Sequence, residues 1–206
     1  MAASLQVEWI AAPERSDAGI AQIVLMHGWG ANSSDLMPLA RELSLPHCDF
    51  GFPNAPLPHP NVPGGRAWYD LESGAGLDES ALLLQEWLEG LPERSGVPLS
   101  RTILGGFSQG GAMTLRVGLT LPLAGLMCLS GYLAASPPRD RLVSSLPPVW
   151  MAHGKQDPVI AVDIARQSQA AIAELGADVT YREYEMGHQI IPDELMQMRA
   201  FVANQS

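Results

Sequence analysis

Cysteine is scarce in this sequence, because its 206 residues contain only Cys48 and Cys128. The two residues form no C-x-x-C pair and show no cysteine–histidine spacing typical of a metal site, so we expect neither a disulfide framework nor a bound metal. Each falls in a stretch of strand character, and we predict two buried free thiols in separate strands. Such thiols suit a reducing compartment, and we expect a cytoplasmic location.

Basic residues and long apolar runs are also few. The 12 lysines and arginines are outnumbered by 22 aspartates and glutamates, which gives a formal net charge of −10. Nucleic acids and anionic membrane surfaces bind clustered positive charge, so neither is an expected partner. No run of about 20 apolar residues could cross a bilayer. Residues 1–8 lack the basic region and apolar core of a signal peptide, and we expect no stable membrane association.

No linker, repeat or low-complexity segment divides the chain, and its length suits one large core, so we expect a single domain over residues 1–206. Apolar and β-branched stretches predict strands at 5–10, 20–26, 48–52, 102–106, 125–129, 149–153 and 179–184. From the third strand onward these stretches alternate with helical stripes, including one at Ile164, Ser168, Ala171, Ile172 and Leu175. This alternation predicts an α/β fold, with a mostly parallel sheet and helices on both faces.

One irregular segment, residues 53–76, is too long for an ordinary connection. Segments of this length usually form lids or binding loops, and we predict that role for it. It is rich in proline and glycine, and its larger apolar side chains are those of Leu57, Val62, Trp68 and Leu71.

Ser108 stands between a predicted strand and a predicted helix, in the sequence Gly106-Phe107-Ser108-Gln109-Gly110. A serine hydroxyl becomes a good nucleophile when a tight turn lifts it from the backbone to a place where a base can reach it. In such a turn the strand and the helix approach so closely that side chains two residues on either side would collide, which explains the two glycines. The pattern therefore predicts a nucleophile elbow.

A serine of this kind needs an acid and then a histidine further along the chain. Asp157 follows the strand at 149–153, and His188 follows the strand at 179–184. In such a triad the histidine takes the serine proton and the carboxylate fixes its tautomer. Asp163 is the rival acid, although its position early in a helix over 161–175 suits a dipole partner better. The other histidines are interpreted as structural (His27, His153) or as parts of irregular segments (His47, His59).

Acyl transfer also needs donors for the negative charge that develops on the carbonyl oxygen. The segment Met26-His27-Gly28-Trp29-Gly30 is again a strand that runs into glycines, which would let this loop fold over the site. We expect one donor to be the backbone N–H of Gln109, directly after the serine, and the other to be the backbone N–H of Trp29.

Taken together, these segments resemble the phospholipase/carboxylesterase family of α/β-hydrolases, which includes acyl-protein thioesterases and small bacterial carboxylesterases. The resemblance extends over nearly the whole chain. The matching segments are 26–31, 52–56, 68–70, 105–112, 130–133, 153–154 with 157–159, and 186–188 followed by Pro192. It implies a single α/β-hydrolase domain, a triad of Ser108, Asp157 and His188, and an oxyanion hole formed by the amides of Trp29 and Gln109.

Three features depart from the family pattern. Trp29 stands where leucine is more usual, and Glu185 stands where bacterial members often have proline. Neither change affects the predicted chemistry. The proline-rich stretch 57–66 is shorter than the corresponding loop of relatives, which commonly covers part of the acyl pocket, so the resemblance informs least about substrate size.

We therefore predict a serine carboxylesterase that hydrolyses small to medium acyl esters, and thioesters as well, without a cofactor. Trp68, Leu71, Tyr132 and Val159 are expected to bind the small-molecule ester. A long-chain lysophospholipase or acyl-protein thioesterase is the nearest alternative, since it uses the same chemistry with a longer apolar channel. An alternative of another class is a non-catalytic ligand-binding module on a hydrolase fold. The oligomeric state is left open.

Overall fold

A twisted sheet of seven strands, in the order β1-β3-β2-β6-β7-β8-β9, forms the centre of the computed structural model, which describes residues 5–14 and 17–205. β1 pairs antiparallel with β3, and the other neighbouring strands pair in parallel. This arrangement confirms the predicted mostly parallel sheet. The strands are β1 (Val7–Ile10), β2 (Gln22–Met26), β3 (Asp49–Pro53), β6 (Thr102–Phe107), β7 (Gly125–Leu129), β8 (Val149–Gly154) and β9 (Val179–Tyr184).

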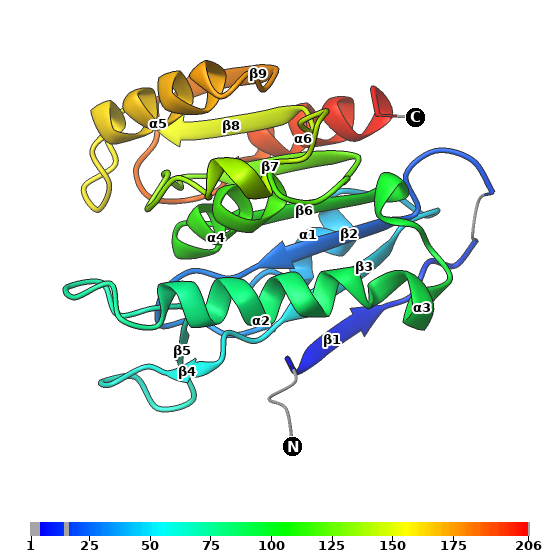
Figure 1. The fold of residues 1–206 in the computed structure, drawn as a ribbon, viewed down its shortest axis with the longest axis horizontal. Coiled ribbons are helices and arrows are strands. Elements are labelled where there is room, and N and C mark those ends of the chain that lie inside the picture. The colour runs from blue at the N-terminus through cyan, green and yellow to red at the C-terminus, as the bar shows by residue number, and fades with distance from the viewer. Residues whose placement is uncertain (1–4, 15–16, 206) are drawn as a thin grey trace.

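Helices cover both faces of the sheet (Figure 1). α2 (Leu77–Glu89), α4 (Gln109–Gly118) and α5 (Val162–Glu174) lie on one face, and α1 (Met37–Glu42) and α6 (Pro192–Ala203) lie on the other. Short helical segments occur at α3 (Leu91–Ser95), η1 (Leu99–Arg101) and η2 (Arg139–Arg141). Each layer buries its own apolar cluster, because β2 and β7 are buried along their whole length and point side chains to both faces.

The strand predictions agree closely with the structure. β7 and β9 have both predicted ends, and the other strands differ by at most two residues at either end. Two details were wrong. Cys48 lies just before β3 rather than inside a strand, and Ile164 is exposed, whereas Ala165, Ser168 and Ile172 form the buried face of α5.

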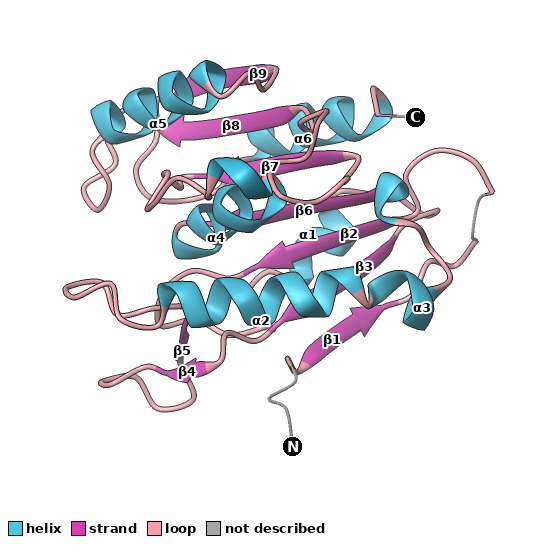
Figure 2. Cartoon of the chain, viewed as in Figure 1, coloured by secondary structure: helices cyan, strands magenta, loops and turns pink. Residues whose placement is uncertain are grey.

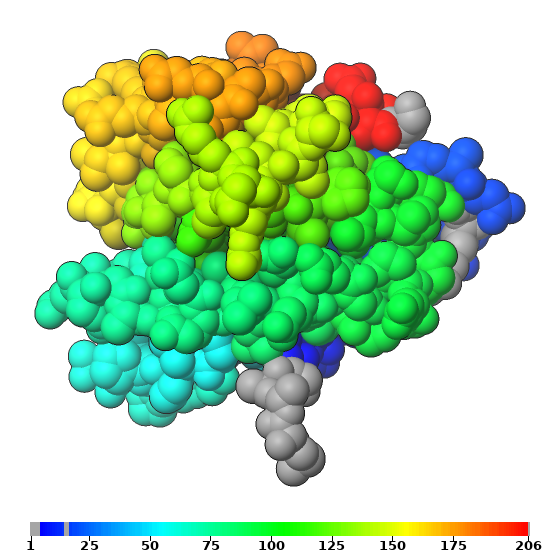
Figure 3. All heavy atoms as spheres, in the orientation of Figure 1, coloured from blue at the N-terminus to red at the C-terminus, as the bar shows by residue number. Residues whose placement is uncertain are grey.

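The loops that follow the parallel strands gather at one edge of the sheet (Figure 2). The strands point the same way, so their carboxyl ends meet there, which is where α/β proteins usually bind ligands. On the face that carries α2, α4 and α5, the segment between β7 and β8 lies over α4 (Figure 3). Arg116 of α4 donates a hydrogen bond to the backbone oxygen of Ser136 in that segment.

The segment 53–76 contains a small two-stranded sheet of β4 (Leu57–Pro58) and β5 (Arg66–Ala67). This hairpin is bonded to the loop after β2, because Gly30 N donates to Arg66 O and Arg66 N donates to Ala31 O. The Arg66 side chain donates to the backbone oxygens of Ala55 and Pro56, which closes the base of the hairpin. The hairpin thus supports the loop after β2, and its role as a moving lid stays a prediction.

Both cysteine thiols are free and buried, as predicted. Burial raises the pKa of Cys48 to about 11 and that of Cys128 to about 12. Within residues 5–14 and 17–205, no helix combines the length and the apolar character needed to span a membrane.

Glu194, in the first turn of α6, has its side chain fully buried. One carboxylate oxygen accepts the backbone N–H of Ile191, 2.9 Å away, while the other has no hydrogen-bond partner within the part of the chain that the structure describes. Burial raises the pKa of this carboxyl from 4.5 to about 7, even though the bond from Ile191 favours the charged form.

The raised pKa of Glu194 predicts a pH-dependent stability. A pKa that is higher in the folded than in the unfolded protein adds stability below about pH 4.5, and this contribution is lost as the pH rises through about 7. Glu194→Gln keeps the oxygen that accepts from Ile191 and cannot ionise. From pH 5 to pH 8, the unfolding free energy of the wild type should fall relative to the variant by on the order of 3 kcal/mol.

Urea denaturation of both proteins at the two pH values measures this difference. Glu174→Gln, which changes an exposed glutamate of α5, is the control and should leave the pH dependence of the wild type intact. If the difference in unfolding free energy between the wild type and Glu194→Gln stayed constant with pH, the raised pKa of Glu194 would be contradicted.

Candidate active site

Ser108 occupies the sharp turn between β6 and α4. Its backbone has φ 55° and ψ −116°, a left-handed conformation that costs roughly 1–3 kcal/mol for a residue with a side chain. The bond from Ser108 N to Leu129 O, 2.8 Å long, helps to hold the turn against the neighbouring strand. A Cβ on Gly106 would lie 2.4 Å from the Gly110 backbone, and one on Gly110 would lie 2.1 Å from the Met26 oxygen. The two glycines are therefore required by direct backbone contact.

Asp157 and His188 are brought together by two loops that run side by side after β8 and β9. Lys155 N donates to Tyr184 O and Gln156 N donates to Met186 O. His188 Nδ1 lies 2.7 Å from Asp157 Oδ2. Because an ionised carboxylate can only accept, Nδ1 carries the proton and Nε2 is left as the acceptor, which is the tautomer that a general base needs.

Asp157 is held by several donors. Its other oxygen, Oδ1, accepts the backbone N–H groups of Val159 and Ile160 at 2.8 and 2.9 Å. Burial by itself would raise the pKa of this carboxyl, but the bonds from Ile160, His188 and Val159 together lower it below its ordinary value. Asp157 thus stays ionised at neutral pH and has a fixed orientation.

His153 is an additional neighbour of Asp157 that the sequence analysis treated only as structural. Its side chain is buried, and its Nε2 donates to Ile160 O at 2.8 Å and lies 3.4 Å from Asp157 Oδ2. His153 therefore anchors the loop that carries Asp157. A histidine followed by glycine at a strand end was the available signal, but only the folded loop shows which group it touches.

The remaining rival residues lie elsewhere. His27 is buried, accepts the backbone N–H of Ala55 at Nε2 and donates from Nδ1 to Gly28 O, a neutral tautomer that agrees with the lowering of its pKa by burial. His47 contacts the Glu14 backbone. Asp163 lies in the first turn of α5, as expected, and pairs with Arg166.

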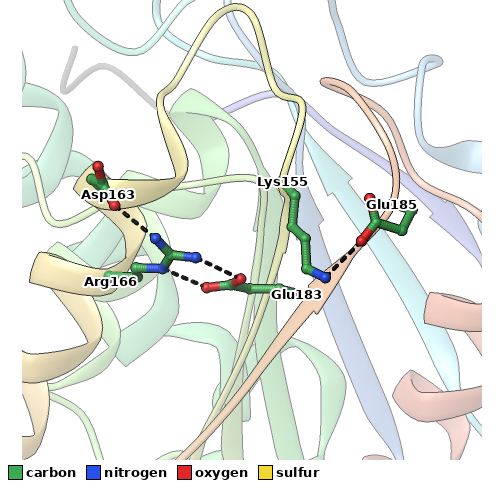
Figure 4. A network of polar contacts seen from close by, with 5 residues as sticks. All are labelled: Lys155, Asp163, Arg166, Glu183 and Glu185. Atoms are coloured by element: carbon green, nitrogen blue, oxygen red, sulfur yellow. Dashed lines mark hydrogen bonds and ion pairs between the residues drawn. The ribbon is translucent and has the colours of Figure 1, made fainter.

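A polar network on the surface lies beside the two loops (Figure 4). Arg166 binds Asp163 and Glu183, while Glu185 accepts from Lys155 Nζ at 2.6 Å and from Gln156 Nε2 at 2.8 Å. Glu185 thus connects the loop of His188 to the loop of Asp157. These groups are largely exposed, so the network contributes modestly to stability.

Ser108 and His188 open into the same cavity, which has a volume of about 600 Å³. Its wall is mostly apolar and is formed by Trp29, Leu71, Ser108, Gln109, Tyr132, Val159, Ile160, Ile164 and His188. Leu71, Tyr132 and Val159 thus lie where the sequence analysis expected substrate contacts. The sequence analysis did not predict Ile160 or Ile164 as cavity residues. Ile164 was assigned to the helical stripe of α5, whereas it is 44% exposed.

Trp68 does not line this cavity, contrary to expectation. It is completely buried, its indole Nε1 donates to His27 O at 3.0 Å, and its backbone N donates to Gln109 Oε1 at 2.8 Å. Leu57 and Val62 of the same segment are also absent from the wall of the cavity. The reason is that the hairpin β4–β5 packs against the loop after β2 and leaves only Leu71 to reach the cavity.

The two residues expected to supply the oxyanion donors come from two separate segments near Ser108. Gln109 is the first residue of α4, and Trp29 is in the loop after β2. A Cβ on Gly28 would lie 3.3 Å from Ser108 Cβ, which shows how closely this loop approaches the serine. The Trp29 ring packs edge-on against His59, with their centroids 4.0 Å apart.

The described residues include no group of three or more histidine, cysteine, aspartate or glutamate side chains that could hold a metal ion.

Similarity to known proteins extends over the whole site. The pattern of the phospholipase/carboxylesterase family matches residues 6–206. Acyl-protein thioesterase 1 of Gibberella zeae is 32% identical over 202 residues, covering 87% of this chain and 85% of that protein. The solved structure of esterase PE8 has a TM-score of 0.87 and 31% identity, covering 99% of this chain and all of that chain. The Bacillus cereus carboxylesterase has the same fold, with a TM-score of 0.83 at 18% identity over 100% of this chain and 96% of that one.

The hydrogen bond between Asp157 and His188 predicts different effects for two aspartates that are only six residues apart. Asp157→Asn should lower kcat for p-nitrophenyl butyrate by about 10³-fold or more, because an amide can hold the histidine in the wrong tautomer. Asp163→Asn, the matched control, removes only an exposed ion pair and should change kcat/KM less than about tenfold. Steady-state kinetics on both variants measures these effects. A larger loss in Asp163→Asn than in Asp157→Asn would contradict the assignment and identify Asp163 as the acid.

Proposed function

The chain belongs to the phospholipase/carboxylesterase family, and from that premise we propose a serine hydrolase in which Ser108, Asp157 and His188 form the catalytic triad. Hydrolysis of carboxylic esters or thioesters is the activity common to its relatives, among them an acyl-protein thioesterase and an esterase that are each more than 30% identical to it. The protein is a hydrolase of this class. The observation that carries the residue assignment is the 2.7 Å contact of His188 with Asp157 beside the cavity that Ser108 lines.

In this mechanism Ser108 Oγ attacks the carbonyl carbon of the ester while its proton passes to His188 Nε2. The new C–O bond forms as the carbonyl π pair moves onto oxygen, and the backbone N–H groups of Trp29 and Gln109 stabilise that oxyanion. Losing one such donor costs about 3 kcal/mol in other hydrolases. The imidazolium, stabilised by ionised Asp157, then protonates the departing alcohol or thiol.

The second half of the reaction repeats the first with water. His188 removes a proton from a water molecule, whose oxygen attacks the acyl-enzyme carbon. The tetrahedral intermediate collapses when Ser108 Oγ leaves and takes the proton back from His188. The acid and regenerated serine are the products, and no step needs a cofactor.

The cavity supports small to medium acyl groups as substrates. Its volume of about 600 Å³ has to accommodate both the acyl group and the leaving group. Each methylene that enters an apolar pocket contributes roughly 0.8 kcal/mol to binding. The value of kcat/KM therefore rises with chain length only while each added methylene is still buried against the cavity wall. We place that limit at about four to eight carbons by the same area argument.

Longer acyl chains are the second candidate, and the rim of the cavity favours them. Leu71, Val159 and Ile164 are exposed by 46%, 66% and 44%, and these apolar side chains adjoin the cavity that Ser108 lines. Part of a longer chain could pack on this rim. Relatives named acyl-protein thioesterase make a thioester of this kind a concrete competitor.

The proposed partner is a small-molecule ester or thioester. A cytoplasmic location remains a prediction that rests on the two free thiols.

The proposed nucleophile is tested by Ser108→Ala. The variant should fold normally and lose at least about 10³-fold in kcat, because members of a triad act as a unit. It should also lose labelling by a fluorophosphonate, which reacts with activated serines. Ser130→Ala is the matched control, because Ser130 has the same unusual backbone, with φ 46°, and follows the neighbouring strand. Near-normal esterase activity in purified Ser108→Ala would refute the assignment.

Substrate size is tested with p-nitrophenyl esters from acetate to palmitate. The value of kcat/KM should rise to a maximum between butyrate and octanoate, and Ile164→Ala should lower it about three- to tenfold for hexanoate while sparing acetate. The control Leu82→Ala shortens an exposed leucine of α2 that lies outside this cavity. A palmitoyl thioester preferred by more than tenfold over hexanoate would favour the long-chain candidate.

A further inference from the structure

The side chain of Gln109 is buried and hydrogen-bonded at both its oxygen and its nitrogen, although the proposed mechanism uses only its backbone. Gln109 is 1% exposed. Its Oε1 accepts Trp68 N at 2.8 Å, and its Nε2 donates to Tyr69 O at 2.7 Å. The amide thus pairs with the backbone of two consecutive residues.

Trp68 continues this connection to the opposite side of the site. Its indole is completely buried and donates to the backbone oxygen of His27 at 3.0 Å. His27 is itself fixed by Ala55 N and by Gly28 O, and it precedes Trp29 by two residues. A continuous set of buried hydrogen bonds therefore runs from Gln109 through Trp68 to the loop that contains Trp29.

Among the described residues, no strand pairing joins the loop of Trp29 to the turn of Ser108 beyond the end of the β2–β6 ladder. β2 and β6 pair in parallel, and the last pair in their register is Met26 with Gly106. Beyond that pair, one chain turns through Ser108 into α4 and the other enters the loop of Gly28 and Trp29. Oxyanion donors must lie within about 0.5 Å of their working positions, so something has to fix the separation of these loops.

Steric contact alone fixes only the minimum separation. The close approaches of Gly110 to Met26 and of Gly28 to Ser108 prevent the loops from moving closer together. Repulsive contacts cannot prevent the loops from moving apart, whereas hydrogen bonds can. From this geometry we propose that the Gln109 side chain is a positioning residue that, through Trp68, sets the distance between the backbone N–H groups of Trp29 and Gln109. This role rests on the proposed function.

The residue type fits the role. Asparagine is one methylene shorter, and glutamate would place a carboxylate oxygen against the Tyr69 oxygen where the amide now donates. Methionine has nearly the same length and volume but forms neither bond. Gln109→Met is therefore the most direct test, and Trp68→Phe, which keeps an aromatic ring but removes the indole donor and some buried volume, tests the other end of the same connection.

The experiment compares the wild type with Gln109→Met, Trp68→Phe and the double variant. It measures kcat and KM on p-nitrophenyl butyrate and the inhibition constant of an alkyl trifluoromethyl ketone of matched length. In the inhibited enzyme Ser108 Oγ adds to the ketone carbon, the π pair moves to oxygen, and the proton goes to His188, so binding reports on the oxyanion donors.

Each single variant should lose about 10- to 100-fold in kcat with KM within about twofold, because a displacement of about 1 Å can cost 10²-fold. The ketone should bind more weakly by the same factor. The double variant should be little worse than the poorer single variant, since both changes break one connection. Thr114→Val removes another buried hydrogen bond of α4, from Thr114 Oγ1 to Gly110 O, and should stay within about twofold in kcat.

Folded Gln109→Met with kcat and ketone affinity within twofold of wild type would overturn the proposal. Losses in the two single variants that multiply in the double variant would overturn it as well, as would losses that disappear when rates are expressed per folded molecule. If Gln109→Met does not fold, a folded Trp68→Phe with wild-type kcat and ketone affinity would overturn the proposal instead. Failure of the proposed function would differ, because the wild type itself would then not bind the trifluoromethyl ketone.

Discussion

Contact between backbones at the carboxyl edge of the sheet is the constraint on which the site depends. At Gly106, Gly110 and Gly154 a Cβ would lie 2.4 Å or less from a backbone atom of another segment. Any side chain there would force apart the strands or loops that carry Ser108 and the Asp157–His188 pair. Because backbone atoms cannot adjust as a flexible side chain can, the glycines limit the relative positions of the segments that follow β2, β6, β8 and β9.

Hydrogen bonds then orient the side chains of the site, and the buried hydrogen bonds contribute more than the exposed ones. Asp157 is oriented by two backbone amides and His188 and is itself buried, so each bond is worth more than it would be at the surface. The exposed network of Arg166 and Glu185 is larger in extent but is screened by solvent. The Glu185 contacts therefore add less to the orientation of Asp157 than the buried bonds do.

Most of the framework was predictable from the sequence because it depends on local patterns. Strands such as Val179–Tyr184 follow from alternation and β-branching, and the serine, acid and histidine each follow a strand in a known order. Trp68 and Ile164 were misplaced because their environments depend on long-range packing. An aromatic residue in an irregular segment gives no local sign of whether it faces a cavity or the core, and the first turn of α5 faces the cavity although a helical stripe includes Ile164.

The position of the hairpin β4–β5 changes how the proline-rich segment relates to specificity. The hairpin binds the loop after β2 through Gly30 and Ala31 and places His59 edge-on against the ring of Trp29. It therefore acts on the rim of the cavity through Trp29, whose side chain is 42% exposed and whose amide is a proposed oxyanion donor. A change of length in this segment is therefore expected to alter the support of the loop that carries Trp29. Substrate range and the proposed oxyanion geometry should then change together, because one loop carries both the bulky rim residue and the proposed donor.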